Sequence, residues 1–132
     1  MKMVDTYINR KKGKEETRYG DEDVEKVLKS TFGVIIYQEQ VMQLAQEFSG
    51  FSLGQADILR RAMGKKKRAE VEKQKQSFIS GAVNNGISKD VAAGIFLKIE
   101  PFAEYGFNKS HAAAYAIISY KTTFLKIYYF QF

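Results

Sequence analysis

Apolar residues recur at spacings of three and four along most of this chain, in four separate windows. In one window, Val41, Leu44, Ala45 and Phe48 stand at positions i, i+3, i+4 and i+7. Residues at these spacings share one face of an α-helix, so each window predicts an amphipathic helix. The chain is therefore expected to be mostly α-helical, a multi-helix unit with at most one short strand near residues 34–36.

Capping residues predict where the helices begin and end. Ser52, with Gln55 three residues later, has the spacing of a capping box. Asp21 or Asp23 can cap a short earlier helix, and glycines are placed to stop three of the helices. The expected helices cover residues 3–10, 21–33, 38–50, 52–64, 67–84, 88–102 and 108–129.

Two of these helices are expected to turn one apolar side each toward a core. The expected core positions are Val71, Phe78, Ile79 and Ala82 in the first, and Val91, Ile95, Ile99 and Phe102 in the second.

The last expected helix is apolar on every side over residues 112–118. Such a helix has to be buried on every side, and a few short helices can hardly cover one that lies at the end of its chain. Residues 1–132 are therefore interpreted as a single fragment of something larger.

Composition excludes several classes of protein. The 132 residues contain no Cys and one His, so neither a disulfide nor a zinc site of the usual ligands is available. The longest apolar run is far shorter than the ~20 residues that cross a bilayer, and the first ten residues lack the core of a signal peptide. A net charge of +6 points weakly to a polyanionic partner.

The densest positive charge lies in the stretch LRRAMGKKKR. Asp57, Arg60 and Arg61 are spaced i, i+3 and i+4, so the carboxylate can hold one guanidinium in place. One interpretation is a cationic helix end that complements the helix dipole, followed by solvated lysines. The other is a phosphate clamp, because guanidinium groups bind phosphate oxygens in pairs.

A second candidate site lies in the stretch YGFNKSH, before the apolar run. Asn108 or Ser110 can cap the following helix, which leaves Lys109, Ser110 and His111 in its first turn. Free backbone N–H groups and the helix dipole favour an anion there. Tyr115, four residues after His111, can reach the same ligand or belong to the core. The alternative is an ordinary cap with an exposed Lys and a half-buried His.

Catalytic acids are missing from the sequence pattern. No pair of carboxylates has the setting that a two-metal phosphoryl-transfer site requires, and Glu39 stands in a first helical turn, where an acid is common. By itself the segment is expected to bind rather than to catalyse.

Four ordered motifs together strongly resemble the alpha subunit of the bacterial replicative DNA polymerase III: GVIIYQEQVMQLAQ, SLGQADILRRAMGKKK, GAVNNGI and YGFNKSHAAAYAIISYKTTFLK. The resemblance runs from about residue 3 to residue 129. It implies part of the fingers domain, which lies over the incoming nucleotide, while the catalytic aspartates and their Mg²⁺ belong to a palm outside this fragment. The parent protein would be a cytoplasmic DNA-directed DNA polymerase without a membrane association. Its partners would be primer–template DNA, dNTP, the remaining polymerase domains and other replisome subunits.

The resemblance also implies roles for the basic motifs. The fragment would hold no catalytic residue and no metal. The residues implied to bind the dNTP are Arg60, Arg61, Lys65, Lys109, Ser110, His111 and Tyr115, and those implied to bind DNA are Lys66, Lys67 and Arg68. Two other classes stay open, a freestanding basic helical DNA-binding module and a helical protein-interaction domain.

Overall fold

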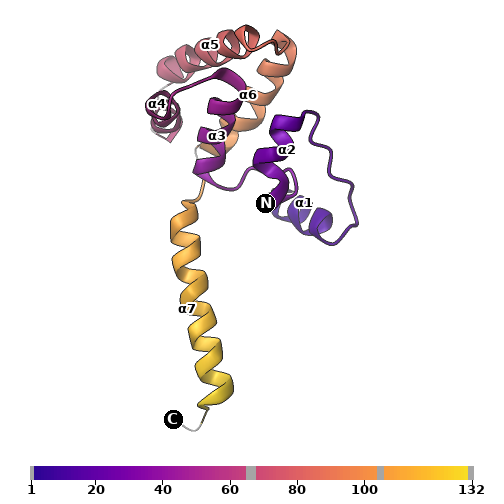
Figure 1. Cartoon of the computed structure of the whole chain (residues 1–132), viewed down its shortest axis with the longest axis vertical. Helices are drawn as coiled ribbons and strands as arrows, with labels where there is room; N and C mark the ends of the chain where they lie inside the picture. Colours follow the sequence, from indigo (N-terminus) through magenta and orange to yellow (C-terminus); the bar gives the residue numbers. More distant parts are fainter. Residues whose placement is uncertain (1, 65–67, 104–105, 131–132) are drawn as a thin grey trace.

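The computed structural model describes residues 2–64, 68–103 and 106–130, and this part of the chain is helical without a strand (Figure 1). The mostly α-helical prediction is confirmed. The elements are α1 (Lys2–Lys11), α2 (Glu22–Leu28), a 3-10 turn η1 (Lys29–Thr31), α3 (Gln38–Ser49), α4 (Leu53–Gly64), α5 (Arg68–Asn84), α6 (Lys89–Ala103) and α7 (Lys109–Tyr128).

Helix α3 lies at the centre, in contact with α2, α4, α5 and α6 (Figure 1). The residues expected on its apolar face, Val41, Leu44, Ala45 and Phe48, are all buried. Burying apolar surface is the main favourable term in folding. Because the neighbouring helices cover this face, α3 forms the centre of the core. The rings of Phe51, Phe78 and Phe96 meet edge to face beside it, at centroid distances of 6.3 and 5.4 Å.

The predicted capping residues hold the helix starts. The Ser52 backbone N–H donates to Gln55 Oε1 at 2.8 Å, and the Gln55 N–H donates back to Ser52 Oγ at 3.3 Å, which completes the capping box of α4. Of the two candidates for α2, Asp21 is the cap, since its carboxylate accepts the Asp23 N–H at 2.8 Å.

The short helix α2 ends earlier than the expected residue 33. It stops at Leu28 and continues as the 3-10 turn. Phe32 and Gly33 then both take positive φ angles, 53° and 73°, which reverse the chain. Phe32 is held there by α1, because its carbonyl accepts the Arg10 guanidinium at 3.2 Å and its ring meets Tyr7 at 5.6 Å.

Helix α6 buries only part of the expected set of apolar residues. Ile95 and Ile99 are buried as predicted, but Val91 is 44% exposed, so its expected core position is wrong. Ala92 and Phe96 are fully buried in its place. Both faces of this helix carry apolar residues. The face that packs against α3 and α5 is the one that includes the small Ala92. The side chain of Phe102 lies outside those described.

The connector before α3 covers residues 34–37 and ends in the extended Tyr37, which forms a parallel bridge with Phe107, the one isolated bridge among the described residues. The buried Gln40 fixes this connector. Its Oε1 accepts the N–H groups of Ile36 and Tyr37 at 2.9 and 3.0 Å, and its amide donates to Thr31 Oγ1 at 2.8 Å. The short strand allowed near residues 34–36 does not form, and the single bridge lies next to it at Tyr37.

Helix α7 points away from the other helices and ends at the far tip of the molecule (Figure 1). None of its residues is buried, and the apolar run over residues 112–118 is largely exposed. The expectation that the other helices cannot cover it is confirmed. No helix in the described ranges is long and apolar enough to cross a membrane.

Candidate functional site

Asp57 holds both arginines of the α4 motif, rather than the single one expected. Arg60 donates to Asp57 Oδ1 through Nε at 2.9 Å and through Nη2 at 2.6 Å, while Arg61 donates to Asp57 Oδ2. Arg60 has a second partner, because its Nη1 also donates to Gln38 Oε1 at 3.2 Å. The Arg61 side chain is 64% exposed against 31% for Arg60. Arg61 is therefore the more open of the two to a ligand.

The two guanidinium groups also change the acidity of Asp57. Hydrogen bonds from Arg61 first, and then from Arg60, stabilise the ionised carboxyl and hold the pKa of Asp57 below its usual range. The carboxylate therefore remains available to orient both arginines at neutral pH.

The start of α7 is already fully capped. The Asn108 side chain accepts the N–H groups of Ser110 and His111 at 2.9 and 3.3 Å, and the Ser110 hydroxyl also donates to it. The Lys109 N–H donates to both carboxylate oxygens of Glu39, at 3.1 and 3.2 Å. The expectation of free backbone N–H groups here is therefore wrong, because the side chains of Asn108 and Glu39 reached them. With these contacts in place, the side chains are the groups at this position that are open to an anion.

Aromatic neighbours fix the His111 ring. It stacks on Tyr115 at a centroid distance of 4.4 Å with 14° between the planes, and the Phe107 ring meets it edge-on at 5.1 Å. Neither Tyr115 nor His111 is buried, so the core interpretation of Tyr115 and the half-buried His111 are both wrong. The imidazole is held in orientation by stacking while it stays open to solvent.

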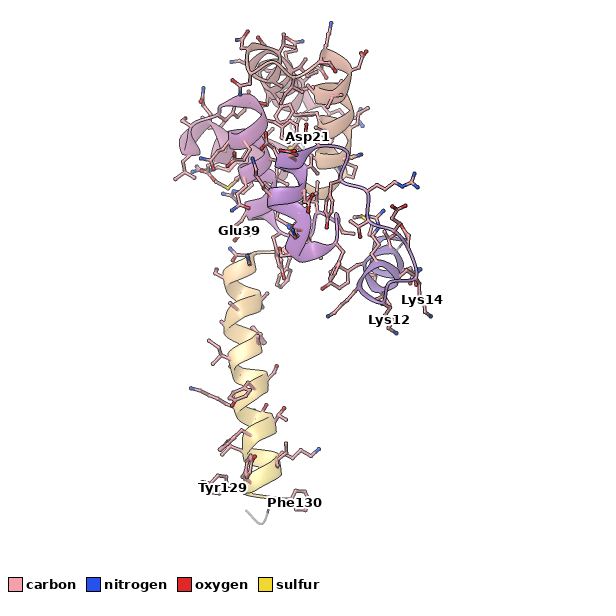
Figure 2. The ribbon with its side chains drawn as sticks, turned by 45° about the vertical axis from the view of Figure 1, so that its right-hand side comes forward. Lys12, Lys14, Asp21, Glu39, Tyr129 and Phe130 are labelled. Carbon is pink, nitrogen blue, oxygen red and sulfur yellow. The ribbon has the colours of Figure 1, made fainter. Side chains whose placement is uncertain are left out.

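The two basic motifs meet the same short segment at the start of α3. Gln38 contacts Arg60, and the adjacent Glu39 contacts the Lys109 backbone. The Lys109 ammonium also lies 5.8 Å from the centroid of the Tyr37 ring, a cation–π distance. Figure 2 shows Glu39 where α3 meets the start of α7. Of three consecutive residues, Gln38 thus contacts α4, whereas Tyr37 and Glu39 contact α7.

The expected DNA-binding residues are only partly within the described structure. Arg68 is exposed at the first position of α5. Lys65, Lys66 and Lys67 lie outside the described residues. Within the described ranges, no three His, Cys, Asp or Glu side chains come together as a possible metal site.

Sequence reasoning overlooked the roles of Tyr37, Gln38, Glu39 and Phe107. Glu39 was interpreted as an ordinary acid in a first helical turn, and no local signal links it to a residue 70 positions later. The one sequence signal that could have indicated these roles was the polar stretch YQEQ at a helix start. Only Gln40 is needed there to cap its own helix, which leaves the other polar side chains for partners elsewhere.

Fold and site together define an all-helical, basic segment in which two cationic motifs are tied to one helix start. Residues 1–86 match the family model of the bacterial DNA polymerase III alpha subunit finger domain. The chain is 55% identical to the DNA polymerase III subunits alpha of Pseudomonas aeruginosa and of Escherichia coli K12, over 96% of its length. It is 51% identical to that of Borreliella burgdorferi, over 98% of its length.

The chain belongs to the bacterial DNA polymerase III alpha subunit finger domain family, as the sequence motifs predicted. It spans 11% of the length of each of these three relatives.

Proposed function

We propose that this chain is the finger segment of a DNA-directed DNA polymerase, in which it binds the triphosphate of the incoming dNTP and covers the nascent base pair. The family supports a place in replicative DNA synthesis. Because the chain spans only a small share of its relatives, the polymerase activity belongs to the longer protein.

The observation that carries the proposal is the common attachment of the two basic motifs. Gln38 and Glu39 tie Arg60 and the start of α7 to neighbouring points of α3. A triphosphate is long and highly charged, so it needs cations from more than one element. Arg61 offers an exposed guanidinium from α4, and Lys109 and His111 offer side chains from α7. Lys65 is proposed to add charge to the same ligand.

These groups would act on phosphoryl transfer through charge. As a primer 3′-hydroxyl attacks the α-phosphate, negative charge grows on the departing pyrophosphate. Positioned cations opposite that charge stabilise the transition state, and a protonated His111 can also donate a proton to the leaving group. Mg²⁺, which we assign to a palm domain outside this chain, would supply further charge neutralisation when bound. Ser110 is proposed to act mainly in the cap, since its hydroxyl donates to Asn108.

Contact with DNA is proposed for the basic stretch of sequence from residue 66 to Arg68 at the start of α5. Arg68 is exposed at the start of α5 and follows three lysines in the sequence. Clustered cations of this kind bind the phosphate backbone without reading the bases. Lys66 and Lys67 are proposed to share this role on the primer–template. The remaining polymerase domains and other replisome subunits are the proposed protein partners.

The test is steady-state kinetics of an intact polymerase that contains this segment. Arg61→Ala should lower kcat/KM for dNTP by roughly ten- to a hundredfold, because a charge-assisted contact is lost. Lys73→Ala, at an exposed lysine of α5, is the matched control and should change little. Equal kinetics for the two variants would overturn the nucleotide role. A loss confined to DNA affinity at low salt would instead favour a DNA-binding module.

A further inference from the structure

Helix α7 is attached to the other helices through one short segment. Phe107, just before it, donates its N–H to the Ile36 carbonyl at 3.0 Å and accepts the Gln38 N–H at 3.1 Å. Glu39 then accepts the Lys109 N–H with both carboxylate oxygens. Since no described residue of α7 is buried, packing against the other described helices does not fix its direction relative to them. The direction of α7 therefore depends on contacts at its first turn.

Of these hydrogen bonds, the pair accepted by Glu39 reaches the backbone of the helix itself. The Phe107 bridge precedes the first residue of α7, so the backbone can still rotate between the bridge and the helix. Glu39 belongs to α3, whose core face is buried, and its carboxylate contacts the first N–H of α7 directly. A negative charge at this point is also favoured by the positive end of the helix dipole.

The residue before it ties in the other basic motif. Gln38 Oε1 accepts the Arg60 guanidinium at 3.2 Å, and Arg60 is joined to Arg61 through Asp57. Gln38 and Glu39, which are adjacent in α3, therefore hold the α4 arginines and the first turn of α7 at neighbouring points of the same helix.

We propose that Glu39 is a positioning residue, which fixes the direction of α7 and so the placement of Lys109 and His111 relative to Arg60 and Arg61. This inference rests on the proposed function for its kinetic consequence, but not for its structural one. Glu39 does not contact the nucleotide in this proposal. Its carboxylate is occupied by the Lys109 backbone, and its role is to hold that backbone in place.

The structural consequence can be measured in the chain itself, which has no Cys. Spin labels on Ser80→Cys in α5 and Lys121→Cys in α7, both exposed, report the distance between the two helices by double electron–electron resonance. The distance distribution should be narrow with Glu39 and broad in Glu39→Ala. Glu39→Gln keeps an acceptor oxygen and should stay narrow. Glu47→Ala, an exposed acid on the same helix, is the matched control and should also stay narrow.

Far-ultraviolet circular dichroism of each variant separates a loosened helix from an unfolded one. A distribution for Glu39→Ala as narrow as that of the unchanged chain would overturn the proposal, because the Phe107 bridge would then suffice. Broadening in Glu47→Ala as well would also overturn it, since the effect would not be specific to Glu39.

The kinetic consequence is measured in an intact polymerase that contains this segment. Glu39→Ala should lower kcat/KM for dNTP about tenfold through misplacement of the α7 cations, and Glu39→Gln should restore most of it. If Glu39 instead occupied the phosphate position until a ligand displaced it, Glu39→Ala would lower KM, and the positioning role would be overturned. Broadened distances with unchanged kinetics would support the positioning of α7 and overturn the nucleotide role of its first turn.

Discussion

The Ser49 hydroxyl, at the end of α3, donates a hydrogen bond of 2.8 Å to the backbone carbonyl of Phe78 in α5. This bond joins the two helices. A Cβ placed on Gly81 of α5 would lie 2.3 Å from the backbone carbonyl oxygen of Ser49, far inside any real contact. The absence of a side chain at residue 81 is therefore what allows α3 and α5 to pack this closely.

Gly81→Ala should therefore destabilise the chain, although Ala is the better helix former. The backbone of α3 has to shift, and overpacking of this kind typically costs ~1–3 kcal/mol in the free energy of unfolding. Gly54→Ala in α4 is the matched control. A Cβ there meets nothing within 4 Å, so this change should be neutral or mildly stabilising. Urea denaturation of both variants measures the difference, and equal stabilities would contradict the close packing.

His111→Ala, in an intact polymerase that contains this segment, is expected to lower kcat more than it raises KM for dNTP. An interaction of the imidazole with charge that develops only as pyrophosphate leaves would stabilise the transition state and not the bound substrate. The stacking on Tyr115 holds the ring in one orientation, which in the proposed function would face that charge. Single-turnover kinetics measures the chemical step, with Thr122→Ala, an exposed position of the same helix, as the control. A rise in KM with unchanged kcat would assign His111 to ground-state binding.

The stability of the chain should carry an acid-sensitive contribution from Asp57. Its pKa is lowered in the folded state by hydrogen bonds from Arg61 and Arg60. The contribution is therefore fully present above the unfolded pKa of an aspartate, about 3.9, and is lost as the pH falls through the lower folded pKa. Asp57→Asn should remove this part of the pH dependence. Urea denaturation between about pH 7 and about pH 3 measures it, and Arg61→Ala should also reduce it.

The 132 residues alone should show no primer extension with Mg²⁺ and all four nucleotides. The described residues contain no cluster of acids that could hold a metal, and the sequence lacks the paired carboxylates that this chemistry requires. A gel assay on a labelled primer–template measures extension, with an intact polymerase as the positive control. Robust extension by the pure chain would overturn the assignment of catalysis to a palm outside it.

The sequence by itself determined the helices and most of their ends. The spacing of Val41, Leu44 and Phe48 predicted the buried face of α3, and the capping box of Ser52 and Gln55 formed as expected. These features depend on residues within about one to two helical turns of each other, so local order in the sequence carries them. The same order gave the motifs that identified the family.

Only the tertiary structure decided what distant residues do to one another. It chose Ala92 over Val91 for the buried side of α6, because both faces of that helix are apolar and packing alone distinguishes them. It brought Glu39 to the Lys109 N–H, 70 positions later in the chain, and so gave a partner to a backbone N–H that the sequence pattern predicted to be free. Local patterns indicate which helix a residue belongs to. The residue that it contacts in another helix depends on how the helices pack, and no short stretch of sequence contains that information.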